Sequence, residues 1–470
     1  MRYTRNNSAG INRSLLDIWK HPAFWLTLSL ILTIVEGSFR KWVAVFDTGY
    51  GRILMYFSKE ICFLLGCALM ASLPIRHELA SRFAKTWVTA ALMAIAVGAG
   101  LSALTDLNLV GAALTIRAVI ILPLLVFFYC SRFNNFPIVG LAVTAIVLAF
   151  ANSFIALIQS SLPPSHILNK YADDTMAVVF VEYGVRATGT FAFIAGLGIM
   201  AEIGVWAGLV VAVLTKGWRY KLLGAFGVFS GFACAFASIS RRPFIVIIAM
   251  IAIWAITAKG SLKRLAHIIS ALLIVVAVIA MFFPSYTSRL QHVGEGTLDR
   301  FESAGDDNQD RAFGQIDELR YAFSTHPLGT GLGTEQIGGS YAKKGYAAFN
   351  SYESQLPRIV AELGAIGFIG YCLLLGAILI SFQRLKKGQS DAWTSVITLT
   401  QILTAGQFYI NMVFNHTASS AIWLIVAAVM AATPLAKRIR PPKAATPGRH
   451  DADDADDADD ADDADDADDA

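Results

Sequence analysis

The chain has 470 residues, of which 55% are hydrophobic and only 16% are charged, and its mean hydropathy is +0.55. Soluble domains carry roughly 25% charged residues, so this composition excludes a soluble multidomain enzyme and indicates an all-α integral membrane protein with many spans. We expect no nucleic-acid partner.

The apolar runs predict about twelve transmembrane helices, because one helix needs about 20 apolar residues to cross a bilayer. The first run begins near Phe24, after a polar, arginine-bearing segment and with no small-residue cleavage site behind it, so we expect no cleavable signal peptide. In chain order, the predicted helices cover 22–38, 53–74, 86–105, 108–130, 136–160, 190–214, 220–238, 243–258, 265–284, 357–383, 392–413 and 418–435.

Basic residues in the short connections predict the orientation, because cytoplasmic loops carry an excess of Lys and Arg. Every even-numbered connection is basic and most odd-numbered ones are not; the exceptions are "FRKW" at 39–42 and "SRR" at 240–242. We therefore expect both termini in the cytoplasm. Arg241 and Arg242 then lie on the outer face, where positive charge is not needed for topology.

This orientation divides the chain into four parts. Residues 1–284 hold the first nine helices, 285–356 form a large outer loop, 357–436 hold the last three helices, and 437–470 form a cytoplasmic tail. Within the loop, the helical spacing of Phe313, Ile316 and Phe323 predicts an amphipathic helix in 310–326. The tail ends in an Asp/Ala repeat without an apolar face, which predicts disorder or an interaction arm.

Without the Asp/Ala repeat at 451–470, the rest of the chain is strongly basic. The repeat contains thirteen of the 35 acidic residues, so the remaining chain has 38 basic residues against 22 acidic ones, a net charge of +16.

Several ionisable residues interrupt the apolar runs, and most of them belong to one layer near the outer face. Lys59, Glu60 and Arg117 are each about two turns below an outer helix end at 1.5 Å per residue. Glu36 ends the first helix, Arg186 precedes the sixth, and only Glu202 lies deep. Charges within a membrane protein are costly and usually functional.

Two explanations remain open for this layer. Lys59 or Arg117 can pair with a glutamate and serve the fold. Alternatively, Arg117, Arg186, Arg241 and Arg242 outnumber the nearby acids and bind an anionic ligand, since the planar guanidinium suits phosphate oxygens. A diphosphate head group at the outer membrane surface fits this charge and place.

The five cysteines give no sign of a metal or disulfide site. Cys62, Cys67, Cys130, Cys234 and Cys372 all fall inside apolar runs, and none forms a CxxC pair. We interpret them as packing residues and expect neither a metal nor a cofactor.

Four motifs, in order, resemble those of the O-antigen ligase and Wzy-type polysaccharide polymerase superfamily. "RATGTFAFIAGLG" at 186–198 is similar to its R-x-x-G-T-F helix start, and "SISRRPFIVIIA" at 238–249 to its S-R helix start. "HPLGTGLGT" at 326–334 is similar to its H-P-L-x-G-x-G turn. "FNSYESQLPRIVAELGAIG" at 349–367 resembles the re-entry into the next helix, which ends in E-x-G-x-x-G.

The resemblance implies a metal-independent glycosyltransferase with a GT-C type fold in the bacterial inner membrane. Its donor would be a glycan on undecaprenyl diphosphate at the periplasmic face, and the large loop would be periplasmic. Arg186 and Arg241 would hold the diphosphate, with Arg242 beside them. A base in the loop would deprotonate the acceptor hydroxyl, which attacks the anomeric carbon with inversion.

The base is one of two points at which this chain departs from the family; the other is "FAFIAG" at 191–196, where the family often has Pro-Asn. Ligases of the family carry His-Asn before the re-entrant helix, and here the pair is Phe349-Asn350. Glu353, four residues further on, is the candidate base, a pattern that resembles polymerases more than ligases. Its alternative role is that of a carboxylate favoured by the helix dipole.

The remaining candidates are predicted to contact substrate. They are Lys59, Arg117, Arg242, Arg320, His326, Gly331 and Arg358. His326 can instead shape the glycine turn, and Arg358 can pair with Glu362 at i+4. Gly331 belongs to a tight turn that lets backbone approach a sugar or phosphate.

Three functions follow for comparison. The first is a polymerase that joins lipid-linked repeat units into exopolysaccharide, capsule or O-antigen, with a flippase and a chain-length regulator as expected partners in the lipid membrane. The second is a ligase that transfers a finished glycan to a lipid or protein. The third is a lipid-linked sugar transporter, which would show charged or broken helices near the midplane and internal repeats.

Overall fold

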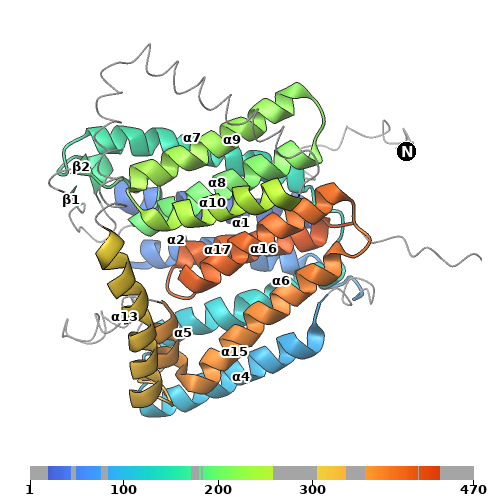
Figure 1. Ribbon diagram of the computed structural model, residues 1–470. Coiled ribbons are helices and arrows are strands. Elements are labelled where there is room, and N and C mark those ends of the chain that lie inside the picture. Colours follow the sequence, from blue (N-terminus) through green and yellow to red (C-terminus); the bar gives the residue numbers. More distant parts are fainter. Residues whose placement is uncertain are drawn as a thin grey trace, which may run out of the picture. The chain divides into compact units, whose positions relative to one another are not determined.

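The computed structural model describes residues 19–43, 49–75, 83–170, 179–180, 184–257, 304–334, 355–410 and 412–434. These residues are mostly helical (Figure 1). The first helices are α1 (Pro22–Trp42), α2 (Gly49–Ala68), α4 (Lys85–Thr105), α5 (Leu109–Ile116), the π-helix η3 (Arg117–Ile121), α6 (Leu122–Arg132) and α7 (Ile138–Ser161). They are followed by a 3-10 turn η4 (Ile167–Asn169), the hairpin β1 (Val179–Phe180) and β2 (Gly184–Val185), and α8 (Ile194–Leu214). The last are α9 (Trp218–Ser238), α10 (Arg241–Thr257), α13 (Ala304–Thr325), α15 (Gln355–Lys386), α16 (Asp391–Ile410) and α17 (His416–Ala432).

The described helices are those of an integral membrane protein. Seven helical stretches are long and apolar enough to cross a bilayer: α1, α4, the run from α5 to α6, α7, α8, α9 and α15. Eleven of the twelve predicted spans coincide with helices, and the remaining one, 265–284, lies outside the described residues. Twelve crossings and a GT-C type fold stay predictions.

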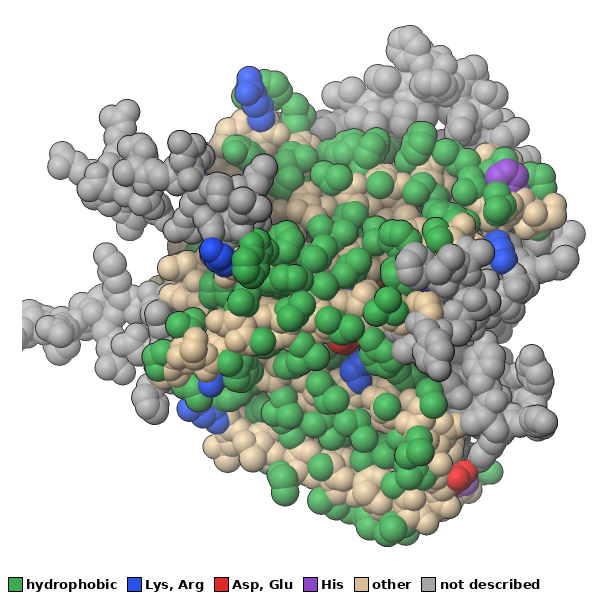
Figure 2. Space-filling view, turned by 180° about the vertical axis from the view of Figure 1, so that it is seen from behind, with side chains coloured by type: hydrophobic (Ala, Val, Ile, Leu, Met, Phe, Trp, Pro, Cys, Tyr) green, Lys and Arg blue, Asp and Glu red, His purple; other side chains and the backbone are tan. Residues whose placement is uncertain are grey.

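The surface of the described part is largely apolar, as lipid contact requires. Figure 2 shows hydrophobic side chains over much of the visible face, with most of its few charged side chains toward the margins. Large hydrophobic side chains on α4 and α7 are exposed, among them Met93, Leu104 and Phe154. A water-soluble protein of this size rarely exposes such a continuous apolar surface.

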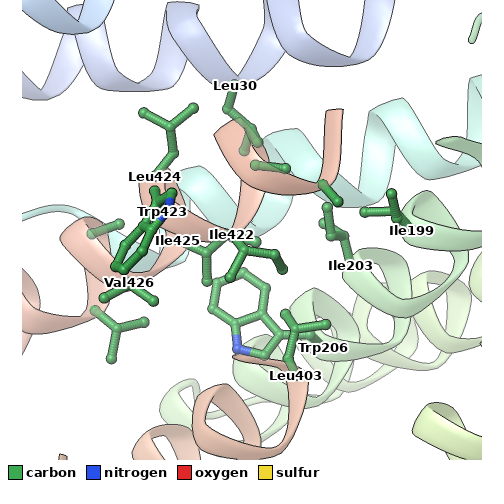
Figure 3. Close-up of a cluster of buried hydrophobic side chains, with 14 of the residues drawn as sticks. Leu30, Ile199, Ile203, Trp206, Leu403, Ile422, Trp423, Leu424, Ile425 and Val426 are labelled. Carbon is green, nitrogen blue, oxygen red and sulfur yellow. The ribbon is translucent and has the colours of Figure 1, made fainter. Parts of the chain in front are cut away.

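The core forms where α8, α16 and α17 meet α1. Trp206, Leu403 and Trp423 are buried there, together with Leu30 (Figure 3). Trp206 Nε1 donates to Thr400 Oγ1 at 3.0 Å, and Trp423 Nε1 donates to the Ala118 carbonyl at 3.1 Å. The indole N–H groups of Trp206 and Trp423 therefore keep an acceptor, which removes the cost of burying them.

Connections predicted for the outer face meet at one end of the helices. The Ala187 N–H donates to the Ala237 carbonyl at 3.0 Å, which joins the segment after the hairpin to the end of α9. The Leu332 N–H donates to the Asp106 carbonyl at 2.9 Å, which joins the large loop to the α4–α5 connection.

Connections predicted for the cytoplasmic face make their contacts with one another. Arg132 Nε donates to the Leu73 carbonyl at 3.1 Å, and Arg384 Nη1 donates to the Phe83 carbonyl at 3.0 Å. Odd and even connections thus gather separately, as alternating spans require. The compartment that each end faces remains a prediction.

The helix predicted at 310–326 is confirmed as part of α13, but Ile316 of its predicted apolar face is exposed. Ala322 is fully buried against Val360 and Ala361 of α15, and Phe323 stacks edge-on against Phe368 with ring centroids 5.2 Å apart. In Figure 1, α13 runs steeply across the helix ends and contacts α15. The apolar face of α13 therefore fixes this part of the loop against the start of α15.

The cysteine prediction is confirmed at four positions and wrong at one. Cys62, Cys67, Cys130 and Cys234 are buried, whereas Cys372 is exposed. Cys372 lies on α15 beside Tyr371, whose side chain is the one that turns inward. Apolar sequence alone does not distinguish a lipid-facing position from a packed one.

Candidate functional site

The segment that follows Arg186 is held from one side by polar side chains of α7. Gln159 Oε1 accepts the N–H groups of Thr188 at 3.0 Å and Gly189 at 2.8 Å. Asn152 Oδ1 accepts the Thr190 N–H at 2.9 Å. Gly189 has φ +58°, a conformation that strains other residues. The R-x-x-G-T motif therefore forms a loop whose backbone shape is fixed by two buried amides.

Helix α1 holds the same loop from another side. Thr190 Oγ1 lies 2.7 Å from the Ile34 carbonyl, and Lys41 Nζ donates to Thr188 Oγ1 at 2.9 Å and to the Gly189 carbonyl at 2.8 Å. A Cβ on Gly37 would collide with the backbone of residues 190–192. Gly37 is thus what lets α1 pass this close to the loop.

Arg186 meets the second motif at the end of α9. Its Nε donates to the Ser238 carbonyl at 3.2 Å. The next residue, Ile239, is buried in the left-handed region with φ +48° and ψ +43°, and α10 begins two residues later at Arg241. A β-branched residue in this region is a conformational outlier, and such strain gathers at functional sites.

The structure therefore brings two of the four motifs together. Arg186 Nε bonds the Ser238 carbonyl and the Ala187 N–H bonds the Ala237 carbonyl, although the two segments are far apart in sequence. Arg242 is exposed on the first turn of α10. The side chain of Arg241 lies outside the described part of the chain, so its contact with a diphosphate stays a prediction.

Lys59 is in the ion pair that the sequence left as an alternative. It is fully buried and pairs with Glu36 of α1, which also receives Arg40 Nη1 at 3.4 Å. The Lys59 ammonium lies 4.9 Å from the centre of the Tyr56 ring. Its charge is thus compensated within the fold.

Arg117 was expected to belong to the arginine excess, and the structure gives it a carboxylate partner. Its Nη1 lies 3.2 Å from Glu60 Oε1, and Ser420 Oγ of α17 donates to the same oxygen at 2.8 Å. Arg117 opens the π-helix η3, a backbone feature common at functional sites. Substrate contact by Lys59 or Arg117 stays a prediction, but neither supplies uncompensated charge.

The glycine turn at 326–334 is packed against backbone on both sides. Gly329, Gly331 and Gly333 have φ of +93°, +142° and +84°. A Cβ on Gly333 would collide with Ala112 N and Asn108 O, and one on Gly331 would lie 2.5 Å from the Asp106 Cβ. Both glycines are buried and pack closely against residues 106–112, and substrate contact by Gly331 stays a prediction.

Glu362 fastens this turn to the membrane helices. Its Oε1 accepts the Gly333 N–H at 2.5 Å and Thr115 Oγ1 at 2.6 Å, and the residue is fully buried. At Gly364, φ is +68° and the helix α15 is interrupted, which lets the Ala365 N–H donate to the Pro327 carbonyl at 2.8 Å. The E-x-G-x-x-G motif thus has a structural role: it holds the glycine turn at a kink.

The remaining candidates, two on or next to α13 and one on α15, have different surroundings. His326 is half-buried at the end of α13, and its carbonyl accepts the Gly329 N–H at 3.0 Å. Arg320 is exposed on α13, 3.8 Å from Asp317. The guanidinium of Arg358 lies 5.8 Å from the Phe414 ring centre. Their substrate contacts remain predictions.

Glu353 lies outside the described residues, but the chain two residues later is firmly anchored. Gln355 Nε2 donates to Tyr371 Oη at 3.0 Å and to the Phe408 carbonyl at 2.5 Å. Its Oε1 accepts the Val413 N–H at 3.1 Å. Gln355 thus ties the start of α15 to the connection between α16 and α17. Gln355 was not among the predicted site residues, because an uncharged glutamine in the polar stretch before the span at 357–383 carries no charge signal.

Sequence analysis also treated Lys41 only as an exception to the loop-charge rule. The structure makes it a buried contact of the loop at 186–191. Lys41 could have been singled out because it is a basic residue at a helix end on the predicted outer face, where topology does not require positive charge.

The comparisons with known proteins agree with the motif order. The sequence model described as O-antigen ligase matches residues 226–372, from within α9 to within α15. This range includes the second, third and fourth motifs, while Arg186 lies before it. A search of curated proteins finds no match to the chain. The match over residues 226–372 thus confirms the resemblance to the O-antigen ligase and Wzy-type polymerase superfamily.

Proposed function

We propose that this protein is a polysaccharide polymerase that joins undecaprenyl-diphosphate-linked oligosaccharide units at the periplasmic face of the bacterial inner membrane. The product is an exopolysaccharide, a capsule or an O-antigen. A flippase supplies the lipid-linked units, and a chain-length regulator is a further partner.

The observation that carries the proposal is the contact between Arg186 and the second motif. The hydrogen bond from Arg186 to Ser238 places a guanidinium next to the turn that leads into Arg241 and Arg242. The buried carboxylates Glu36 and Glu60 already have cationic partners in α1, α2 and η3. Arginines gathered beside a helix start supply the bidentate donors that diphosphate oxygens require.

The reaction follows from these roles. The acceptor hydroxyl oxygen forms a bond to the anomeric carbon as the bond from that carbon to the diphosphate oxygen breaks, with inversion. The electron pair of the broken bond stays on undecaprenyl diphosphate, whose growing charge Arg186 and Arg241 stabilise. Glu353 accepts the hydroxyl proton as general base. Arg242, Arg117, Lys59, Arg320, His326, Gly331 and Arg358 are the candidate substrate contacts.

A ligase is the second candidate, favoured by the description of the matching domain as O-antigen ligase. In a ligase, the same donor chemistry delivers a finished glycan to a lipid or protein acceptor. Phe349, at the position where the family's ligases hold histidine, supports the polymerase. A deletion strain separates the two, since long glycan that persists on the lipid carrier without reaching its acceptor contradicts a polymerase.

A transporter is the weakest alternative. Among the described residues, the deep charge is Glu202, whose Oε2 accepts Gln407 Nε2 at 2.5 Å inside the core. The other buried charged residues that the structure describes belong to the layer predicted near the outer face: Glu36, Arg40, Lys41, Lys59, Glu60, Arg117 and Glu362. Transport coupled to ions would place more charge near the midplane.

Residue-level tests use chain extension by purified, membrane-reconstituted protein. We expect Arg186→Ala and Arg241→Ala to abolish extension while the protein stays folded, and Lys221→Met, at an exposed lysine of α9, to leave it unchanged. Normal polymer length in both arginine variants contradicts the diphosphate site.

Glu353→Gln with near-wild-type activity removes Glu353 as the base. A chelator should have no effect, and metal-dependent activity contradicts the mechanism.

A further inference from the structure

Lys41 is a buried cation whose hydrogen-bond partners are neutral oxygens. It lies in the last turn of α1 and is 4% exposed. Its Nζ donates to Thr188 Oγ1 and to the Gly189 carbonyl, and it makes no ion pair with a carboxylate among the described residues. This sets it apart from Lys59, Arg40 and Arg117 in the same part of the fold, each of which has a glutamate.

The donors of Lys41 are not all used by these two bonds. An ammonium group carries three N–H donors, and Thr188 and Gly189 accept two of them. The ring of Trp42, 4.8 Å from Nζ at its centre, attracts the charge without taking a hydrogen bond. A buried ammonium without a carboxylate is costly in a membrane protein and marks a binding site by default.

The indole of Trp42 is a second and independent indication that a hydrogen-bond acceptor is missing at this end of α1. Its indole Nε1–H is buried and has no hydrogen-bond partner in the described part of the chain, unlike the indoles of Trp206 and Trp423. A buried N–H without an acceptor loses the hydrogen bond that it makes with water in the unfolded chain, which is costly. Two neighbouring residues at the end of α1 therefore hold N–H groups that an anionic oxygen would satisfy.

The position of these donors connects them with the motif that begins at Arg186. Lys41 bonds residues two and three positions after Arg186, and Arg186 itself is anchored at Ser238. We propose that Lys41 and Trp42 form a third binding element for the lipid-linked diphosphate, with the ammonium and the indole N–H donating to its phosphate oxygens. This inference rests on the proposed function, because it assigns further ligands to the same diphosphate.

A purely structural role predicts different behaviour. A lysine near a helix C-terminus is favoured by the helix dipole, and its two bonds also hold the loop at 188–189. In that case, loss of Lys41 lowers stability and weakens all ligands alike. A phosphate-binding role instead lowers the preference for diphosphate over monophosphate.

The test measures binding of undecaprenyl diphosphate and undecaprenyl monophosphate to the full chain in detergent micelles, by microscale thermophoresis. Because a hydrogen bond to a charged group contributes about 1.5–3 kcal/mol, we expect Lys41→Met to weaken diphosphate binding about tenfold or more and to reduce the diphosphate preference. Lys41→Arg should retain most of the affinity. Trp42→Phe, which keeps the ring and removes the N–H, should weaken binding by a smaller factor, and Lys221→Met should match wild type.

The outcomes distinguish this inference from the proposed function. Wild-type affinity and preference in Lys41→Met, with Arg186→Ala impaired, overturns the role of Lys41 alone. An unchanged Trp42→Phe overturns the role of the indole. If Lys41→Met does not fold, Lys41→Arg and Trp42→Phe still test the proposal.

A wild-type protein that binds no undecaprenyl diphosphate overturns the proposed function itself. Equal competition by phosphatidylglycerol shows a general phospholipid site and contradicts the assigned ligand.

Discussion

Arg117 has a structural partner in Glu60 and is at the same time a predicted substrate contact. It is 4% exposed, its guanidinium faces Glu60, and its Cζ lies 5.5 Å from the Tyr56 ring centre. Removing one member of a buried pair leaves an uncompensated charge, whereas removing both does not. A variant that lacks both Arg117 and Glu60 therefore distinguishes a structural role of Arg117 from a substrate contact.

We expect Arg117→Met to lower the free energy of unfolding by about 3–5 kcal/mol, because Glu60 is left charged and buried. Adding Glu60→Gln should restore part of that loss, measured by SDS titration in mixed micelles. If Arg117 also contacts substrate, the double variant regains stability but not chain extension. Full extension by the double variant would make Arg117 purely structural.

At the scale of elements, glycines decide how closely the helices approach. The interruption of α15 at Gly364 brings the Ala365 N–H to the Pro327 carbonyl, and a Cβ on Gly364 would lie 2.8 Å from the Leu328 carbonyl carbon. Along the same helix, a Cβ on Gly376 would have no neighbour within 4 Å. The two glycines therefore make a matched pair for substitution.

We expect Gly364→Ala to destabilise the protein by more than the left-handed conformation alone, which costs about 1–2 kcal/mol. Gly376→Ala should be neutral or stabilising by up to about 1 kcal/mol, because alanine favours a helix interior. Unfolding in SDS measures both. Equal effects in the two variants would contradict the role given to the kink.

Helices α4 and α15 pack through a second pair of glycines. They lie side by side in Figure 1, and a Cβ on Gly98 would collide with the backbone of Gly367. Small residues at such contacts let membrane helices approach closely. Gly100, on the same helix, has open space around it.

Gly98→Ala should therefore destabilise the protein by about 1–3 kcal/mol, the usual cost of overpacking. Gly100→Ala serves as the control and should leave the unfolding transition in place or raise it slightly. A Gly98→Ala variant as stable as Gly100→Ala would contradict the close contact.

At the scale of the whole chain, the described connections segregate into two groups that make separate contacts. The α4–α5 connection bonds the large loop, and α6 bonds the end of the α2 segment. Alternating spans place these groups on opposite sides of the membrane. The basic residues of the even-numbered connections predict that the side with these connections faces the cytoplasm.

Single cysteines at exposed positions test the orientation. Leu107 and Ser390 are exposed, in connections predicted to be periplasmic and cytoplasmic. With Cys372, the exposed native cysteine, replaced by alanine, Leu107→Cys should react with a membrane-impermeant maleimide in intact spheroplasts. Ser390→Cys should react only after lysis. The reverse pattern would invert the topology and move the proposed site to the cytoplasm.

Much of the fold could be predicted from the sequence because the bilayer imposes simple requirements. A span needs a long apolar run, so the apolar helices fall where such runs occur, and the break between α9 and α10 coincides with the polar SRR. The amphipathic pattern in 310–326 likewise predicts α13, because its apolar face recurs at helical spacing. Exposure of Cys372 was missed, since lipid and protein core select the same side chains.

The candidate site was predictable as a set of motifs but not as a set of contacts. Hydrophobicity and charge in the sequence predict the spans and their alternation. The family motifs are read directly in their order along the chain. Only the tertiary structure decides which charge meets which: Glu60 neutralises Arg117, Glu362 holds the glycine turn, and Lys41 reaches the loop after Arg186. The physical reason is that ion pairs and buried hydrogen bonds join residues far apart in sequence, and their partners are set by helix packing.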